Sequence, residues 1–347
     1  MDFKEILEQL ADGQDLQADE AAGALRAIIS GEISDAEIAA FLFGMRAKGE
    51  TTQELTAFVR VMREAAVKPD VEVEGAVDLC GTGGDNSGTF NISTAAMFVV
   101  AGAGVPVLKH GNRSVSSNCG SADVLEALGA VPTLRREGVE QVFRETGMAF
   151  MFAPHFHPAM KHVMPARRAL GVRTFFNILG PLLNPAGVRR QMVGAYSREV
   201  ARQMVQILAN LDTEFAYGVN AHDGLDEVSV CAQTVVFELN GKMINDSVIF
   251  DPRSLDFEWH DMEELQGGGR EVNAGIIRDL LSGDGAAGPR SVVLLNAAFG
   301  INASGMAGGL QEARKMADDS LASGEAQRAL ERFAEATRQA RSEEEGS

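Results

Sequence analysis

The 347-residue sequence predicts an α/β fold, with a small all-helical domain followed by a larger domain whose mostly parallel central sheet is covered by helices. Two observations support this prediction. Residues 1 to about 68 have their apolar residues at helical spacing, as in Ile38, Leu42 and Met45. Beyond Lys68-Pro69-Asp70, short apolar runs alternate with amphipathic stretches, which is typical of a parallel sheet with helical crossovers.

The helical region has recognisable helix starts and a recognisable end. Ser34 with Glu37, and Thr51 with Glu54, fit the capping box that opens a helix. Pro69 disfavours helical geometry in the residue before it, so we place the boundary there. This gives a helical domain of residues 1–70 and an α/β domain of residues 71–347. The apolar stripes of the first domain are expected to form core or subunit contacts.

The second domain is expected to begin with five strands and the helices that connect them. The expected strands are residues 76–80, 105–108, 149–153, 191–196 and 214–218, and the expected helices between them are residues 121–128, 137–145 and 199–211. Residues 158–170 form a further expected helix. Runs at 228–231 and 234–239, with Asn240-Gly241 after them, predict an antiparallel addition with a hairpin turn. Long helices are expected at 307–321 and 325–340, and disorder only at 342–347.

Composition excludes several classes of protein. The net charge of −18 argues against a nucleic-acid surface, which needs a basic face. The three cysteines, Cys80, Cys119 and Cys231, form no CxxC pair, which suits a reducing compartment and argues against structural zinc. The first residues lack the features of a signal peptide, and the apolar stretch around 95–108 is too short to span a membrane. We expect a cytoplasmic protein with no nucleic-acid or membrane partner.

Two strand-to-loop transitions predict a phosphate-binding site. The first strand runs into the glycine-rich residues 81–88, followed by the helix-capping types Asn91, Ser93 and Thr94. The second runs into residues 109–117. Glycines let backbone N–H groups approach an anion, and a helix N-terminus favours negative charge. No lysine follows Gly88, so this is no Walker loop, and Asn86 replaces the third glycine of a dinucleotide fingerprint. A glycine-rich turn without a ligand is the alternative.

These loops resemble the anthranilate phosphoribosyltransferase family, through Gly-Thr-Gly-Gly-Asp at 81–85, Asn-Ile-Ser-Thr at 91–94 and Lys-His-Gly-Asn-Arg at 109–113. The resemblance covers nearly the whole chain. It implies transfer of a phosphoribosyl group from phosphoribosyl pyrophosphate to the amine of anthranilate, in tryptophan biosynthesis. It also implies a homodimer formed through the helical domain, which residues of about 158–190 complete. The residues implied to bind phosphoribosyl pyrophosphate are Gly81, Gly84, Asp85, Thr89, Asn91, Ile92, Ser93, Thr94, Lys109, His110, Gly111, Asn112, Arg113, Ser114, Val115, Ser116, Ser117 and Ser121.

The segment from His155 to Pro185 carries the implied acceptor site. Its histidines lack the HExxH spacing of a zinc site. Arg167 and Arg168 alone would be interpreted as surface charges. The family pattern, His-Pro-Ala-Met-Lys with a following arginine and then Arg-Thr-x-Phe-Asn, implies that Arg167 binds anthranilate. Gly81 and Asn112 complete the implied acceptor site.

An acidic pair supplies the implied metal site. Asp226 and Glu227 follow a strand that ends near Asn220, where ligands of such sheets collect. A solvated turn is the commoner meaning of such a pair. The resemblance of Gly-Leu-Asp-Glu-Val-Ser to the family motif implies that the pair binds one Mg²⁺ and that Ser93 binds another, giving two ions per subunit. Oxygen ligands shared with substrate phosphates suit magnesium.

The implied reaction is displacement of pyrophosphate at C1 of the ribose. Because an aromatic amine already has a free lone pair, we assign no general base, and the residue type of His110 alone does not establish a proton-transfer role. Asn118-Cys119 stands where the family commonly has a lysine, which predicts slightly weaker phosphate binding. The alternatives are a pyrimidine nucleoside phosphorylase-like enzyme, a non-catalytic nucleic-acid-binding paralogue, and a relative that uses another aromatic acceptor.

Overall fold

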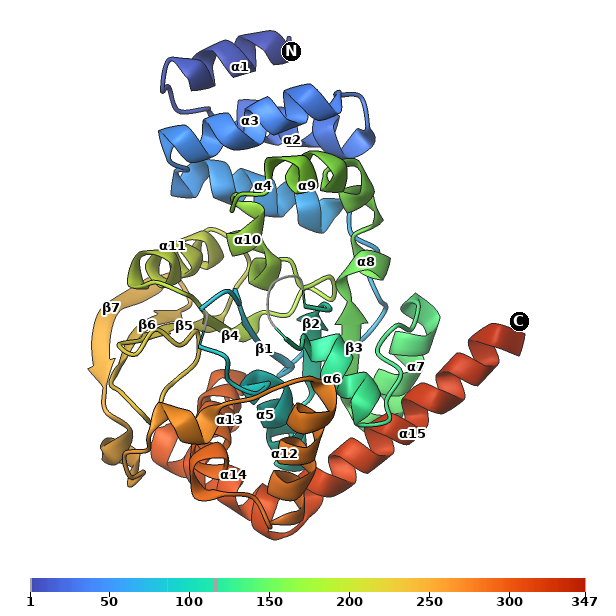
Figure 1. The fold of residues 1–347 in the computed structure, drawn as a ribbon, viewed down its shortest axis with the longest axis vertical. Coiled ribbons are helices and arrows are strands. Elements are labelled where there is room, and N and C mark those ends of the chain that lie inside the picture. Colours follow the sequence, from blue (N-terminus) through green and yellow to red (C-terminus); the bar gives the residue numbers. More distant parts are fainter. Residues whose placement is uncertain (1, 86, 115–117, 347) are drawn as a thin grey trace.

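A lobe of four helices begins the chain in the computed structural model, which describes residues 2–85, 87–114 and 118–346 (Figure 1). The capping boxes predicted at Ser34 and Thr51 are both present, each closed by the glutamate three residues later. These boxes satisfy backbone donors that the first helical turn leaves open. The helices are α1 (Phe3–Ala11), α2 (Ala18–Ser30), α3 (Asp35–Lys48) and α4 (Thr52–Glu64).

A seven-stranded sheet forms the centre of the larger lobe, so the predicted fold class is confirmed. The strand order is β3-β2-β1-β4-β5-β6-β7. The first five strands in this order are parallel, and the β5–β6 and β6–β7 pairs are antiparallel. The β1 strand therefore lies between β2 and β4, where the direction of winding reverses and ligands of such sheets bind. The strands are β1 (Val77–Gly81), β2 (Val107–Gly111), β3 (Met148–Phe152), β4 (Arg190–Gly194), β5 (Phe215–Ala221), β6 (Thr234–Asn240) and β7 (Met243–Phe250).

Two predicted elements are wrong. Residues 228–231 form no strand, because side chains pair with their backbone: Asn296 accepts a hydrogen bond from Val228 N–H at 3.0 Å and donates one to its carbonyl at 2.8 Å. The helix predicted at 158–170 is broken into the 3-10 helix η1 (Pro158–His162) and α9 (Met164–Leu170). Pro165, in the first turn of α9, explains the break, since a proline inside a continuous helix would remove a hydrogen bond. The predicted hairpin between β6 and β7 is confirmed.

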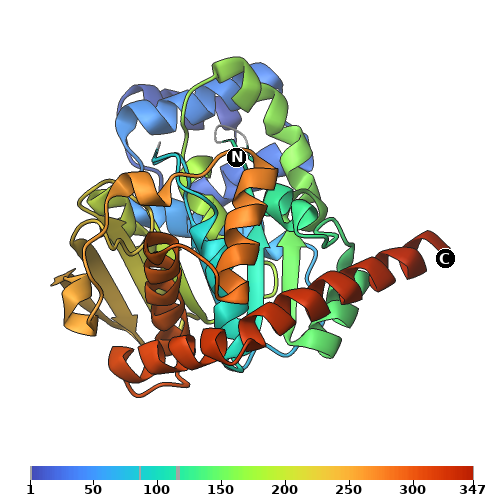
Figure 2. The same cartoon turned by 60° about the horizontal axis from the view of Figure 1, so that its bottom comes forward.

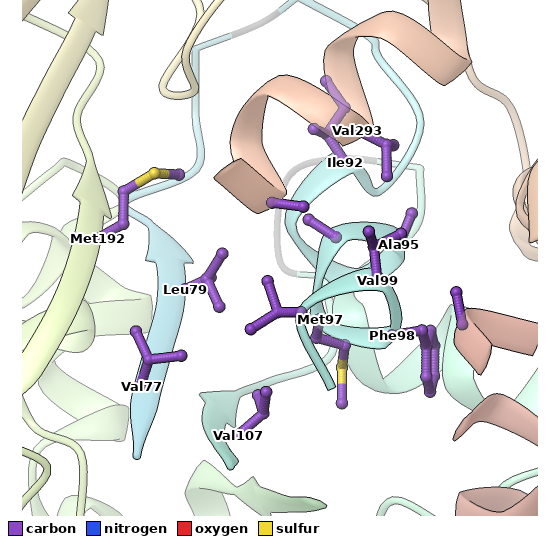
Figure 3. Packing of buried hydrophobic residues seen from close by; sticks show 14 of the residues in the cluster. Val77, Leu79, Ile92, Ala95, Met97, Phe98, Val99, Val107, Met192 and Val293 are labelled. Carbon is purple, nitrogen blue, oxygen red and sulfur yellow. The ribbon is translucent and has the colours of Figure 1, made fainter. Parts of the chain in front are cut away.

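Apolar side chains cover both faces of the sheet. On one face, α5 (Ile92–Gly102) and α13 (Ala287–Ser304) cover β1, with Leu79 pointing toward α5 and Val293 lying beside Ile92 (Figure 3). Phe98 of α5 points away from β1, and its ring lies edge-on to that of Phe333 at 6.1 Å. Helix α15 (Glu325–Gly346) runs across the end of the sheet remote from the helical lobe (Figure 2). It extends beyond the predicted end, because Glu344 accepts a hydrogen bond from Arg135 N–H at 2.8 Å. The other elements are α6 (Ser121–Ala127), α7 (Arg136–Thr146), α8 (Ala153–Phe156), α10 (Phe176–Leu179), η2 (Gly180–Leu182), α11 (Arg198–Ala209), η3 (Pro252–Leu255), η4 (Met262–Leu265), α12 (Arg270–Ser282) and α14 (Leu310–Ala322).

The helical lobe is completed by residues from the middle of the chain. Phe175 stacks on Phe58 of α4 at 4.6 Å between ring centroids and lies edge-on to Phe41 of α3 at 6.3 Å. The same apolar cluster continues through α9 and α10 to α11 on the second face of the sheet. The helical lobe thus lies over the end of the sheet toward which the β3 arrow points in Figure 1. In the described part of the chain, no helix is long and apolar enough to cross a membrane.

Candidate active site at the ends of β1, β2 and β4

The two predicted phosphate loops begin side by side, because β1 and β2 are neighbouring parallel strands that end at Gly81 and Gly111. Gly83 and Gly84 have φ values of +64° and +73°, which a side chain would disfavour. The first loop then leads into α5, an 11-residue helix whose N-terminal N–H groups face this end of the sheet. Positive partial charge and accessible backbone donors therefore gather at this edge.

Asn91 was predicted to cap α5, and it occupies the N-cap position without making a side-chain cap. Its side chain instead joins three segments. Its amide nitrogen donates to the carbonyl of Cys119 in the second loop at 3.0 Å, and its amide oxygen accepts from Asn273 of α12 at 2.9 Å. Asn273 is buried and also accepts from Gly268 N–H at 2.7 Å. Sequence reasoning missed Asn273, because a lone asparagine far along the chain belongs to no motif.

The acidic pair lies against the first loop. Asp226 accepts a hydrogen bond from Gly83 N–H at 2.6 Å, and Glu227 accepts one from Ser93 N–H at 3.2 Å. Glycines at two strand ends make room for this pair. A Cβ on Gly81 would lie 2.4 Å from a carboxylate oxygen of Asp226, and one on Gly194 would lie 1.5 Å from its carbonyl oxygen. Both strand ends must therefore lack side chains for the acidic pair to lie here.

Lys109 provides the positive charge of this site. Its side chain is almost fully buried, and its ammonium group donates to the carbonyl of Leu79 and to Ser93 Oγ, the latter at 3.3 Å. Burial raises the pKa of Asp226, and the nearby charge of Asp85 raises it further. Burial likewise raises the pKa of Glu227, and the charge of Asp226 adds to that shift. Lys109 opposes both shifts. One ammonium group therefore faces three carboxyl groups, and a bound cation would favour their charged forms.

The donor set fits a magnesium ion that is shared with substrate oxygens. Two carboxylates and the Ser93 hydroxyl are hard oxygen ligands, which Mg²⁺ prefers. Within residues 2–85, 87–114 and 118–346, no group of three His, Cys, Asp or Glu side chains is placed to hold a metal ion by itself. Waters and phosphate oxygens would therefore supply the remaining ligands, as is usual for magnesium.

A buried polar cluster lies behind the second loop. The rings of His110 and His157 meet edge-on at 5.2 Å, and His157 Nε2 lies 2.9 Å from the carbonyl of Leu183. Burial lowers the pKa of His110 to about 3 and also lowers that of His157, so both rings are neutral at physiological pH. Asp78 accepts from Asn184 at 2.8 Å, and burial raises its pKa to about 6. Neutral His110 lacks the acidic proton that an imidazolium would carry.

The remaining predicted residues make no contact with the acidic pair among the described hydrogen bonds and ion pairs. Arg167 is half-buried, with its guanidinium 5.2 Å from the ring centre of Phe176, and Arg168 is exposed. Arg113 pairs with Asp123 at 3.0 Å and with Glu126, so its charge is engaged. The other predicted site residues also lie at the loop ends. In the first loop, Thr89 forms a β-bridge with Gln266, and Ile92 and Thr94 are buried at the start of α5. In the second loop, Asn112 accepts a hydrogen bond from Arg113 N–H, Ser114 N–H donates to Asp123, and Ser121 begins α6. Val115, Ser116 and Ser117 lie outside the described residues.

Comparison with known proteins gives matches along nearly the whole chain. The family model described as "Glycosyl transferase family, helical bundle domain" matches residues 4–66, and "Glycosyl transferase family, a/b domain" matches residues 73–327. The chain is 50% identical to an anthranilate phosphoribosyltransferase of Salinibacter ruber, over 97% of this chain and 99% of the relative. It is 46% identical to the enzyme of the same name from Desulfatibacillum aliphaticivorans, with the same coverage of both chains.

Solved structures give the same result. The anthranilate phosphoribosyltransferase of Thermus thermophilus superposes with a TM-score of 0.90 at 39% identity, covering 97% of this chain and 100% of that one. The Saccharomyces cerevisiae enzyme in complex with phosphoribosyl pyrophosphate and Mg superposes with a TM-score of 0.89 at 26% identity, covering 97% and 98%. Both agree with the helical lobe and the mostly parallel sheet described above.

Proposed function

This chain belongs to the anthranilate phosphoribosyltransferase family, and we propose that it transfers the phosphoribosyl group of phosphoribosyl pyrophosphate to the amine of anthranilate. The products are N-(5-phosphoribosyl)anthranilate and pyrophosphate, so the enzyme is a pentosyltransferase of tryptophan biosynthesis. The observation that carries the proposal is the convergence of Lys109, Ser93 and the Asp226–Glu227 pair beside the first glycine-rich loop.

The phosphates of the donor would lie along the two loops. Backbone N–H groups of Gly84, Asp85 and residues 91–94 would hold oxygens, and the Lys109 ammonium group would face the charge that grows on the departing pyrophosphate. Asp85 accepts from Ser87 Oγ at 2.6 Å, which keeps its carboxylate within the loop. Residues 109–117 of the second loop and Ser121 would bind the rest of the donor.

Magnesium would neutralise the pyrophosphate when it is bound. We propose two ions per subunit, one held by Ser93 and the other by Asp226 and Glu227. A yeast structural relative was solved with phosphoribosyl pyrophosphate and Mg, which supports the metal but not the number of ions. A titration of the metal-free protein with Mg²⁺ and donor would count them.

Gly81, Asn112 and Arg167 are proposed to orient anthranilate. A guanidinium can grip a planar carboxylate with two parallel hydrogen bonds. A relative from yeast was solved with 4-fluoroanthranilate, which supports an aromatic acceptor of this kind. The amine attacks C1 of the ribose with its own lone pair, so we still assign no general base. Its pKa of about 3 makes the ring of His110 a weak proton acceptor, which agrees with that choice.

Loss of anthranilate fluorescence, measured with the purified protein, phosphoribosyl pyrophosphate and Mg²⁺, tests the proposal. We expect Arg167→Ala to raise the KM for anthranilate, and Asp226→Asn with Glu227→Gln to lower kcat by about 100-fold. The exposed neighbour Arg168→Ala is the matched control and should behave like the wild type. Donor binding without turnover would refute the choice of acceptor, and no donor binding would refute the whole proposal.

Assembly and location are further parts of the proposal. We propose that residues 1–70 and about 158–190 act as one lobe and form a homodimer, since Phe43 of α3 leaves a large apolar side chain 55% exposed on it. Sedimentation of the wild type and of Phe43→Asp would test this interface. A cytoplasmic location is a further part of the proposal, and cell fractionation would check it.

A further inference from the structure

Arg173 links the helical lobe to the first phosphate loop, although no motif assigned it a role. It lies in the connection between α9 and α10. Its backbone belongs to the helical lobe: Arg46 of α3 donates to its carbonyl oxygen. The two residues that follow Thr174 are Phe175 and Phe176, and both are buried in the helical-lobe cluster. The backbone at Arg173 is therefore fixed to the helices.

The side chain of Arg173 reaches the other lobe. Its Nη2 donates to the carbonyl oxygen of Gly84 at 2.7 Å, and its guanidinium lies 4.8 Å from the ring centre of Tyr196. Tyr196 belongs to the same edge, because its N–H donates to Thr82 Oγ1 at 3.2 Å. In the described part of the chain Arg173 forms no ion pair, and its guanidinium contacts Gly84 and Tyr196. One side chain thus carries an unneutralised positive charge to the loop that is proposed to hold phosphate.

Peptide geometry gives this contact a consequence for the loop. In a trans peptide the carbonyl and the following N–H point in opposite directions, and no cis peptide occurs among the described residues. Fixing the carbonyl of Gly84 toward Arg173 therefore directs the N–H of Asp85 to the opposite side. Turning this peptide over would change ψ of Gly84 and φ of Asp85, and glycine at position 84 leaves the first of these two torsions free to change. A turned peptide would present an oxygen to the phosphate in place of a donor.

We propose that Arg173 is a positioning residue that sets the Gly84–Asp85 peptide for the phosphoribosyl donor and ties donor binding to the position of the helical lobe. This inference rests on the proposed function, because it takes the anion to be the diphosphate of phosphoribosyl pyrophosphate. Arg173 acts through the Gly84 peptide and needs no contact with the reacting atoms. Arg46 serves the same link from the helical side, by holding the Arg173 backbone.

Calorimetric binding of phosphoribosyl pyrophosphate with Mg²⁺, in the absence of acceptor, tests the inference. Because Arg173 is exposed to solvent, we expect Arg173→Met to raise the Kd by about threefold to tenfold. Arg173→Lys should recover part of the affinity, since a single donor to Gly84 is needed. Arg46→Met should show a smaller loss in the same direction. The matched control is Arg168→Met, an exposed arginine five positions earlier, which should leave the Kd unchanged.

Steady-state kinetics and thermal unfolding separate positioning from general damage. We expect Arg173→Met to raise the KM for the donor more than the KM for anthranilate, with a Tm close to that of the wild type. An unchanged donor Kd, or an equal rise in both KM values together with a lowered Tm, would overturn the inference while the proposed function stands. Failure of the wild type itself to bind the donor would overturn both.

Discussion

The buried His110–His157 pair predicts a specific dependence of stability on pH. His110 has a pKa of about 3 in the folded protein, because burial disfavours its charged form, against about 6.5 in an unfolded chain. Between these values the unfolded chain binds a proton that the folded protein does not. The free energy of unfolding contributed by His110 is therefore complete above pH 6.5 and is lost as the pH falls toward 3.

The size of this effect follows from the shift. Each pH unit below 6.5 removes about 1.4 kcal/mol, so acidification from pH 7 to pH 5 removes about 2 kcal/mol. Asp78 acts in the opposite direction. Its folded pKa of about 6 is above the ordinary 3.8, so its cost is present at pH 7 and is relieved as the pH falls below 6. The pH dependence of wild-type stability would show only the sum of the His110 and Asp78 effects. The His110 effect is therefore measured as the difference in unfolding free energy between the wild type and a His110 variant.

His110→Asn isolates the contribution of His110 to the pH dependence of stability, because asparagine is polar and does not titrate. We expect the difference in unfolding free energy between wild type and His110→Asn to shrink by about 2 kcal/mol from pH 7 to pH 5. Urea unfolding at several pH values measures it. The exposed His222→Asn is the control, and its curve should run parallel to that of the wild type. Parallel curves for His110→Asn and the wild type would show that His110 is not held neutral by burial.

Three other predictions concern the loops. Asn273→Ala leaves two polar partners on half-buried residues unpaired and should lower the free energy of unfolding by about 1–3 kcal/mol, measured by urea unfolding. A loss below about 0.5 kcal/mol would exclude the bridging role. Gly81→Ala should push the Asp226 carboxylate aside and raise the Mg²⁺ needed for half-maximal rate, whereas Gly180→Ala, where a Cβ meets no atom within 4 Å, should not. Lys109→Met removes the positive charge facing the acidic pair and should lower kcat/KM by about 100-fold; wild-type values would contradict its role.

Much of the fold was predictable because local patterns and long-range packing agree. The capping boxes, the alternation of strands and helices and the β6–β7 hairpin all follow from short stretches of sequence. The apolar run 228–231 misled the prediction. The backbone groups of Val228 are satisfied by Asn296, which is 68 residues away, and no local pattern can report such a partner.

The candidate site could be predicted where its residues belong to a continuous sequence motif. The glycine-rich loops and the Asp226–Glu227 pair were found in this way, and the structure brings Ser93 and Lys109 to the same place. Asn273 belongs to no motif, and Arg173 opens the quoted Arg-Thr-x-Phe-Asn motif without an assigned role. Both were missed, because the partners Asn91 and Gly84 are far from them in the sequence. Such contacts can be recognised only in the folded structure, where the loops and their distant partners lie together.

The split helical lobe constrains how the protein can be made. Phe58 of α4 finds its stacking partner Phe175 more than a hundred positions later in the chain. A ribosome adds about 5–20 residues per second, so the first helices wait on the order of ten seconds before the segment that completes their core emerges. During that interval the apolar faces of α3 and α4 have no permanent cover. Nascent chains paused between residues 70 and 175 should therefore recruit chaperones most strongly, and a fragment ending near residue 70 should be prone to aggregate.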